Sequence, residues 1–492
     1  MPQELRANSK VTAGGLAVLL LLAATACEQP PRPERAILRL GVSNAPALAT
    51  ERGVKQFLQN MTSEGLLRVN SEGHLEPWLA EGWTTSSDGL NLVIRLRANV
   101  TFHDGSAADA EAIAAILNTQ LATSLKTVAV DVESISAKGT REIEVHLRRP
   151  SALFPDSLMD VQIVKTGTAG VATGAFKTAD EQNAKDAQVI AYDNYYLGKP
   201  QLGGLRVSTY PNVRAAWADM LRDQLDMLYE VGNEALATMQ ASRKVSLYAF
   251  ERPYQYTIFL NTRNAKLKDP ALRQALNEAI DRDAFVRNAM DGNGTPSAGP
   301  VSPHHWAFDK TPQIFTYAPA RAAAKLTRPL TLKCVTLADP PFEQLALIVK
   351  QQLREVGVNL EIEQAGIEQV FGILSSPDFE TVLLDPSSGW SLMRPYRWWH
   401  SKGGSNQTKF SSPLVDAALE SISHAANESE YRTAVSAFQA AVAEDPPAIF
   451  LAWSKRSRAV SSEFDVSPQP GRDVLASLRM WHPRTDNRNT TH

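Results

Sequence analysis

A single short stretch of the chain gathers side-chain types that proteins use to bind small molecules. It runs from Asp385 to His400 and reads DPSSGWSLMRPYRWWH. Aromatic rings bury a large area at little entropic cost, and guanidinium groups hold carboxylates through paired hydrogen bonds. We therefore predict a ligand-binding site formed by Asp385, Trp390, Arg394, Tyr396, Arg397, Trp398 and Trp399. The alternative for any single tryptophan is a place in the hydrophobic core.

The charges of this stretch indicate the kind of ligand. The sequence has no carboxylate between Asp385 and Asp416, whereas Arg394 and Arg397 stay positively charged near neutral pH. A buried arginine without a partner is costly, so either the ligand or a nearby acid such as Asp385 should pair with it. The sequence therefore predicts a ligand with a carboxylate or another acceptor group rather than a cationic one. Which arginine faces the ligand is left open.

Other residues that could do chemistry form weaker patterns. His304 and His305 lie beside Trp306 and could contact a metal or haem. Adjacent histidines with no third ligand nearby are more often surface residues. A hydrolase would need a nucleophile paired with a base, and the sequence shows no such pair. We therefore predict a protein that is not an enzyme, with no catalytic residue, no metal site and no cofactor.

The N-terminus predicts export. A basic start precedes an uncharged stretch from Val11 to Ala26, which is short for a membrane-spanning helix and typical of a secretory signal. The small residues before Cys27 resemble a bacterial lipoprotein box, in which the cysteine is lipidated and becomes the first mature residue. We predict a signal peptide over residues 1–27 and a Pro-rich tether over residues 28–35. The alternative is an ordinary cleaved signal in which Cys27 has no role.

The composition limits the class of protein. The chain has 492 residues, 43% of them hydrophobic, and a formal net charge of −3. One hydrophobic core does not hold so much apolar material, so two or more lobes are expected. No basic excess exists to neutralise phosphates, which argues against nucleic acid as a partner. The only cysteines are Cys27 and Cys334; with Cys27 lipidated, Cys334 has no partner and is expected to be a small buried hydrophobe.

Strand and helix patterns alternate along the chain. Residues 330–337 and 358–362 alternate as strands do, and between them lies a helical apolar face that ends at Gly357. Two strands joined by a helix should lie parallel, with a right-handed connection. A further helix is predicted from its N-cap, Asp269, towards Met290. The alternation predicts an α/β fold.

A series of short motifs runs along nearly the whole mature chain. The segments are EGLLR (Glu64–Arg68), LEPWLAEGW (Leu75–Trp83), SDGL (Ser87–Leu90), FHDG (Phe102–Gly105), TGAFK (Thr173–Lys177), YDNYYLGKP (Tyr192–Pro200), NT with the helix that follows it (Asn261–Arg282) and QQLREVGV (Gln351–Val358). In this order and spacing they resemble the extracellular solute-binding proteins of family 5, which include dipeptide-, oligopeptide- and nickel-binding proteins. Each motif is weak alone, but together they are specific.

This resemblance implies a two-lobed α/β clam-shell of the periplasmic-binding-protein type (type II, cluster C-like), with lobe I discontinuous in sequence. Lobe I would comprise residues 36–261 and 454–482, with a small subdomain at about 85–190, and lobe II would comprise residues 262–453. Residues 483–492 would form a frayed tail. The ligand would lie between the lobes and stabilise the closed form.

The same resemblance implies the solute-binding subunit of a peptide-type ABC importer. The protein would be a monomer, periplasmic or at the cell surface, anchored to the membrane by lipid on Cys27. It would deliver a peptide or another small organic ligand to ABC permease and ATPase subunits. Peptide-binding members often carry an aspartate shortly after a Gly-Trp pair, whereas here Gly389-Trp390 is followed by Ser391 to Arg394. A metal chelate, haem or a non-peptide organic ligand therefore stays open.

Overall fold

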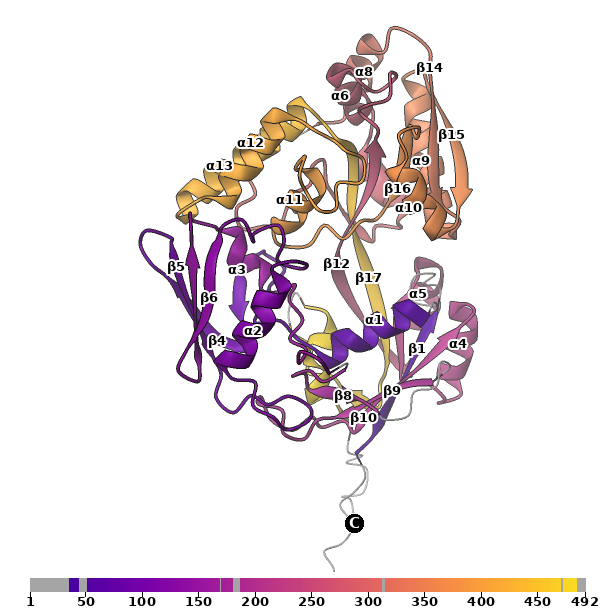
Figure 1. The fold of residues 1–492 in the computed structure, drawn as a ribbon. Coiled ribbons are helices and arrows are strands. Elements are labelled where there is room, and N and C mark those ends of the chain that lie inside the picture. The colour runs from indigo at the N-terminus through magenta and orange to yellow at the C-terminus, as the bar shows by residue number, and fades with distance from the viewer. Residues whose placement is uncertain are drawn as a thin grey trace, which may run out of the picture. The chain divides into compact units, whose positions relative to one another are not determined.

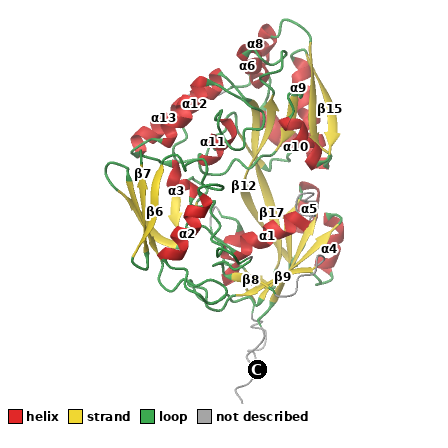
Figure 2. Ribbon diagram, viewed as in Figure 1, coloured by secondary structure: helices red, strands yellow, loops and turns green. Residues whose placement is uncertain are grey.

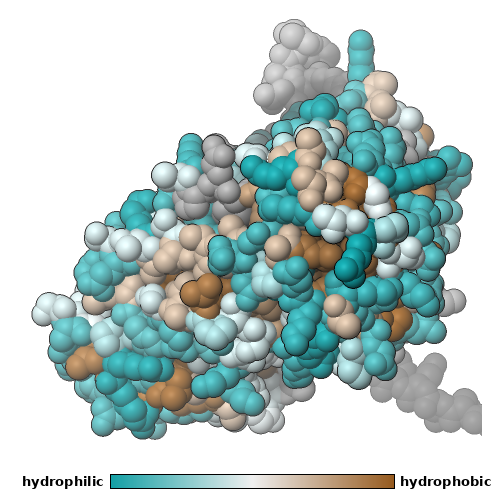
Figure 3. All heavy atoms as spheres, turned by 90° about the horizontal axis from the view of Figure 1, so that it is seen from above, coloured by the Kyte–Doolittle hydropathy of each residue, from teal (hydrophilic) through white to brown (hydrophobic). Residues whose placement is uncertain are grey.

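The structure is a computed structural model that describes residues 35–43, 51–168, 170–179, 186–311, 315–469 and 472–484. The predicted signal peptide, Cys27, most of the tether and most of the tail lie outside these residues. Within the described ranges, the longest apolar helices fall short of what crossing a bilayer requires. Seen from above, the surface is largely hydrophilic, with apolar residues in small groups (Figure 3).

One large mixed sheet runs through the described chain (Figure 1). Its strands, in order across the sheet, are β15 (Val358–Ala365), β14 (Leu330–Leu337), β16 (Thr381–Leu384), β12 (Val245–Leu260), β17 (Ala448–Ser461), β11 (Met227–Val231), β1 (Ile37–Ser43), β10 (Gly204–Tyr210), β9 (Asp186–Ala191) and β8 (Phe176–Thr178), with β13 (Gly294–Pro296) beside β17. The strand β12 pairs antiparallel with both of its neighbours, β16 and β17. The strands β14, β15 and β16, which come later in the chain than β12, form one end of the sheet.

A second, antiparallel sheet of four strands lies apart from the first (Figure 2). Its order is β4 (Ala80–Thr85), β5 (Asn91–Leu96), β7 (Glu142–Leu147) and β6 (Val132–Lys138). The described chain also has two pairs of short strands, β2 (Leu67–Val69) with β3 (Leu75–Pro77) and β18 (Phe464–Asp465) with β19 (His482–Pro483).

The helices connect the strands and cover the sheets (Figure 2). They are α1 (Glu51–Thr62), α2 (Ala110–Gln120), α3 (Leu153–Ser157), α4 (Val213–Leu221), α5 (Asn233–Gln240), α6 (Pro270–Glu278), α7 (Arg282–Ala289), α8 (Pro319–Lys325), α9 (Pro340–Glu355), α10 (Ile367–Ser375), α11 (Met393–Trp399), α12 (Pro413–Ser423), α13 (Glu428–Glu444) and a 3₁₀ helix (Val474–Met480). The 3₁₀ helix near the end of the chain lies close to α1, and both helices line the same cavity.

The predicted strand–helix–strand unit is confirmed. β14 and β15 pair parallel from Leu330 opposite Val358 to Leu337 opposite Ala365, and α9 joins them. Cys334, in β14, is fully buried and free, as its apolar surroundings predict. Burial raises the pKa of its thiol to about 11, so the thiol stays protonated and inert near neutral pH.

The single helix predicted from Asp269 to Met290 is wrong, because the structure has two helices there. Asp269 caps α6, accepting a hydrogen bond from the Ala271 amide at 2.9 Å. Asp281 takes an extended conformation and caps α7, accepting from the Ala284 amide at 2.8 Å. A second N-cap ends the helical path, although the apolar periodicity continues across it.

The strands β12 and β17 contribute to several cores. The C-terminal half of β12, with Tyr256 and Ile258, packs with α6, α7 and α9. Its N-terminal half, with Val245 and Leu247, packs with α4 and α5. We call the half of the sheet with β1 and β8–β11 lobe I, and the half with β14–β16 lobe II. The residue boundaries predicted for the lobes and the subdomain stay predictions.

The core of the four-stranded sheet is continuous with part of lobe II. A single cluster of buried side chains includes Leu153 and Phe154 of α3 and also Met393 and Trp399 of α11. Since α3 lies against α11, this contact joins the region of the four-stranded sheet to lobe II.

Candidate ligand-binding site

The ladder between β12 and β17 is interrupted where the strands pass from one lobe to the other. Pairing is regular as far as Glu251, opposite Lys455, and resumes at Gln255, opposite Trp453. Arg252, Pro253 and Tyr254 fill the gap. Proline has no N–H to donate to a ladder, which is why it is found at bulges and edges of sheets.

The segment that follows β16 is fixed to this interruption. The carbonyl oxygen of Pro253 accepts hydrogen bonds from the Ser388 amide at 2.9 Å and the Gly389 amide at 3.0 Å. Tyr254 forms an isolated antiparallel bridge with Ser387. Gly389 has a φ of +64°, a conformation that glycine takes without strain. The chain after β16, where the predicted site begins, therefore lies against the gap in β12.

Four charged side chains meet here, three from different strands and one from the residue that follows a fourth strand. Arg252 comes from β12, Glu230 from β11, Arg456 from β17, and Asp385 from the end of β16. The Arg456 Nε donates to Glu230 Oε1 at 2.6 Å. The Arg252 Nη1 lies 3.6 Å from Asp385 Oδ2 and 3.8 Å from Glu230 Oε1. Glu230 belongs to lobe I and Asp385 to lobe II, so the group spans the junction of the lobes.

Burial and charge act in opposite directions on the two acids. Burial raises the pKa of Asp385, and the neighbouring arginines only partly reverse this. Burial would also raise the pKa of Glu230, but Arg252 and Arg456 hold it below its ordinary value. Glu230 is thus the acid that balances the arginines, and Asp385 is the one whose charge is poorly satisfied.

Arg252 is held loosely. Its guanidinium lies over the Tyr254 ring, 4.3 Å from the ring centre. Its two acidic neighbours among the described residues, Glu230 and Asp385, are beyond hydrogen-bonding distance. The Arg252 side chain is 20% exposed. Asp385 is 21% exposed. A ligand at this position could therefore receive hydrogen bonds from Arg252 and donate to Asp385.

Trp390 also lies near the gap. Its ring stacks on Trp453 with the ring centres 5.6 Å apart and the planes at 20°. Trp453 is fully buried and stands opposite Gln255, where the ladder resumes. Trp390 itself is half-buried, so part of its ring is available to an apolar group.

The two predicted arginines are paired with an acid of the protein. Arg394 Nη2 donates to Asp160 Oδ1 at 2.6 Å, and Arg397 Nη1 lies 3.8 Å from Asp160 Oδ2. Asp160 follows α3 in the chain, so these contacts join α11 to the region of the four-stranded sheet. The acid that pairs with Arg394 is thus Asp160 rather than Asp385. Whether either arginine contacts the ligand stays a prediction.

The remaining predicted aromatics pack around α11. Trp399 is only 4% exposed and contacts Phe259 and Phe450. It therefore lies in the hydrophobic core, which was the alternative expected for any single tryptophan. Trp398 donates its indole N–H to the Ser387 carbonyl at 3.1 Å. Tyr396 donates its hydroxyl to Glu420 at 2.9 Å.

Reasoning from sequence missed Glu230, Arg252 and Arg456. A signal was present for Arg252, because Pro253 interrupts a long apolar strand pattern, and prolines inside strands mark bulges. Glu230 and Arg456 gave no such signal, since nothing in the sequence shows which strands become neighbours.

In the described part of the chain, the histidine pair is not part of any group of three or more potential metal ligands. His305 is buried, and burial lowers the pKa of its ring to about 3. Its Nδ1 accepts a hydrogen bond from the Ala307 amide at 3.1 Å. His305 therefore has a structural role as a neutral ring.

The sequence pattern of the family described as "Bacterial extracellular solute-binding proteins, family 5 Middle" matches residues 74–407. The chain belongs to this family. As a family 5 solute-binding protein it has relatives with different ligands. The oligopeptide-binding protein AppA of Bacillus subtilis is 21% identical, over 86% of this chain and 87% of its own. The heme-binding protein A of Haemophilus influenzae is 26% identical, over 50% of this chain and 52% of its own.

Solved structures share the fold of this family 5 protein. NikZ from Campylobacter jejuni, in complex with Ni(L-His), matches with a TM-score of 0.78 and 21% identity, over 91% of this chain and 99% of that chain. The predicted family and the predicted two-lobed clam-shell are both confirmed. The family consists of extracellular solute-binding proteins.

A half-buried acid lies at the contact between α3 and α11. Asp156, in α3, receives a hydrogen bond from the Ser391 hydroxyl. Burial raises the pKa of Asp156 to about 7, and the nearby negative charge of Asp160 adds to this shift. Folding therefore favours the neutral form of Asp156.

We expect Asp156→Asn to remove a pH-dependent loss of stability. The pKa of Asp156 is raised in the folded state, so the folded protein favours the protonated acid. The stability that this protonation gives is fully present below about pH 4 and is lost as the pH rises through about 7. Denaturant unfolding should show the variant to be more stable than the original protein by roughly 1–3 kcal/mol at pH 8, with little difference at pH 4. Asp378→Asn, at an exposed acid, is the control. A difference that does not change with pH would contradict the assignment.

Proposed function

We propose that this family 5 protein is the solute-binding subunit of an ABC importer and not an enzyme. It captures a small ligand between its lobes and delivers it to a membrane permease. One observation carries the proposal most strongly: acids from both lobes and two arginines from the shared strands meet at the interruption of β12. A ligand held there touches both lobes at once.

The mechanism is a shift between open and closed arrangements. Contacts made with both lobes are complete only when the lobes are together, so the ligand stabilises the closed form by those contacts. The gap at Arg252 to Tyr254 lacks ladder hydrogen bonds between β12 and β17, which makes it the place where the strands bend at least cost. The same residues thus serve both bending and binding.

The side chains at the gap indicate the chemistry of the ligand. Arg252 offers unused N–H groups to a carboxylate, and Asp385 offers oxygens to an ammonium or another donor. The half-buried face of Trp390 suits an apolar group between them. A peptide or an amino-acid derivative carries all three features. Arg394, Tyr396, Arg397 and Trp398 would form the wall on the lobe II side, with Trp399 in the core behind them.

A metal chelate is the second candidate. NikZ, which matches this fold, was solved with Ni(L-His), whose histidine carries a carboxylate and an amino group. The described residues hold no metal-ligand cluster, so a metal would arrive inside a chelate. Arg252 would then hold the carboxylate of the chelating molecule. Haem carries carboxylates too and belongs to the same group of candidates.

We expect Arg252→Ala to weaken binding more than Arg394→Ala. Removing the loosely held guanidinium takes away contacts with the ligand and should cost roughly 2–5 kcal/mol in affinity. Arg394 is already paired with Asp160, so its removal should change affinity by a smaller amount. The ligand that remains on the purified protein would be identified by native mass spectrometry and then titrated by calorimetry. Full affinity in Arg252→Ala together with a large loss in Arg394→Ala or Arg397→Ala would place the ligand at α11 instead.

Closure of the lobes should be visible in solution. With saturating ligand, small-angle scattering should give a smaller radius of gyration than without ligand, because the closed form is more compact. Arg252→Ala at the same ligand concentration is the control, since it should stay close to the unliganded value. An unchanged radius with proven binding would argue against closure.

We also propose export and anchoring, as a monomer, in the periplasm or at the cell surface. Support comes from the uncharged stretch before Cys27 and from a family of extracellular proteins. Cys27→Ala should move the protein from the membrane fraction to the soluble fraction, because an alanine cannot carry the lipid. Membrane fractionation and mass spectrometry of the N-terminus measure this. A wild-type protein that is soluble and without lipid would refute the anchor.

A further inference from the structure

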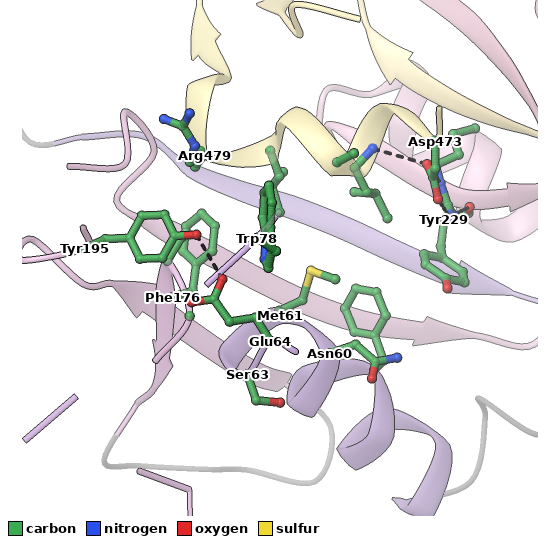
Figure 4. Close-up of a pocket in the computed structure, with 17 residues that line it drawn as sticks. Asn60, Met61, Ser63, Glu64, Trp78, Phe176, Tyr195, Tyr229, Asp473 and Arg479 are labelled. Atoms are coloured by element: carbon green, nitrogen blue, oxygen red, sulfur yellow. Dashed lines mark hydrogen bonds and ion pairs between the residues drawn. The ribbon is translucent and has the colours of Figure 1, made fainter. Parts of the chain in front are cut away.

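A cavity of about 370 Å³ lies beside the C-terminal end of α1 (Figure 4). Its lining includes five aromatic side chains, those of Phe57, Trp78, Phe176, Tyr195 and Tyr229, and the 3₁₀ helix near the C-terminus closes one side. Tyr195 stands at one end and Tyr229 at the other, with Trp78 between them. The volume is that of a site for a small molecule with a single ring.

One wall of the cavity carries a buried acid. Glu64 is only 8% exposed, and its carboxyl group faces Tyr195. The Tyr195 hydroxyl donates to Glu64 Oε2 at 3.0 Å. The other oxygen, Oε1, is buried without a hydrogen bond of good geometry among the described residues. A buried carboxyl group with one such oxygen can take a further partner.

The surroundings of Glu64 can accept its charge but do not balance it. Tyr195, Tyr196, Thr173 and Trp78 all lower its pKa, yet burial outweighs them and raises the pKa to about 8. Near neutral pH the acid is therefore mostly protonated when the cavity holds no cation. Donors are already in place around the carboxylate, and what it lacks is a positive charge.

The other charges around the cavity are engaged. Arg458 and Asp473, at the far end, form an ion pair through two hydrogen bonds. Arg479 donates a hydrogen bond to the Leu197 carbonyl at 3.0 Å, and its positive charge lowers the pKa of Tyr195, although burial raises that pKa by more. Arg68 interacts electrostatically with Tyr195, and its guanidinium lies over the Trp78 ring. It also forms an ion pair with Glu76. Glu76 is shared with Arg472.

We propose that this cavity is a second binding site, which takes a small organic ammonium ion with an apolar body. The ammonium lies against Glu64, and the apolar body lies among the rings of Trp78, Phe176 and Tyr229. Aromatic faces attract cations as well as burying apolar area. The site is distinct from the one between the lobes, because its lining comes from lobe I, the segment with Trp78 and the 3₁₀ helix.

Binding is coupled to a proton. An ammonium pairs with the carboxylate form of Glu64, so the acid gives up its proton to solvent when the ion binds. With a pKa of about 8, roughly nine molecules in ten are protonated at pH 7 and half at pH 8, so affinity should rise about fivefold over that interval. An alkylammonium keeps its own proton in this range.

Calorimetry with benzylamine tests the proposal on the full mature chain. Benzylamine should bind, and titrations in buffers of different ionisation enthalpy should show about 0.9 proton released per molecule bound at pH 7. Benzyl alcohol and benzoate, which have the same ring without the positive charge, should bind at least tenfold more weakly. Arg252→Ala should leave benzylamine binding unchanged, which separates this site from the one between the lobes.

Two variants examine the cavity by different means. Glu64→Gln removes the negative charge and should weaken benzylamine binding at least tenfold and abolish proton release. Ala476→Trp leaves Glu64 untouched and places a large ring at an exposed lining position, so it should block entry. The proposal is overturned if the original protein does not bind benzylamine, or binds benzoate more tightly. Equal binding by the original protein and Ala476→Trp, or binding without proton release, would overturn it too.

Discussion

Pro253 has no N–H group to place in the ladder between β12 and β17, and the three residues from Arg252 to Tyr254 leave that ladder incomplete. The gap falls where β12 leaves the core of lobe I and enters that of lobe II. Its open backbone oxygen holds the chain after β16 through Ser388 and Gly389. Strand pairing, lobe junction and candidate site therefore coincide because of one interruption.

Electrostatics explains why this junction can respond to a ligand. Arg456 is tied to Glu230 by a hydrogen bond, whereas Arg252 and Asp385 stand 3.6 Å apart and lack one. Burial raises the cost of each unsatisfied charge. A ligand that brings one acceptor and one donor would satisfy both.

The sequence predicted those features that local patterns encode. The β14–α9–β15 unit follows from alternation and a glycine stop, and the N-cap at Asp269 follows from residue type, whereas the second cap at Asp281 was missed. The family followed from the order of short motifs between Glu64 and Val358, and the family's sequence pattern matches residues 74–407. Local patterns could not show that Arg394 would meet Asp160, because the two lie 234 positions apart in the chain. Nor could they bring Glu230 and Arg456 to Asp385, since that depends on the order of strands in the sheet.

The central claim is that the ligand sits at the interruption of β12, between Arg252 and Asp385. A crystal structure of the protein with the ligand it retains on purification tests this most directly. The account predicts an acceptor atom of the ligand within hydrogen-bonding distance of the Arg252 guanidinium, with an apolar part against Trp390. A ligand bound only to the arginines of α11, with Arg252 and Asp385 unchanged beside it, would contradict the account.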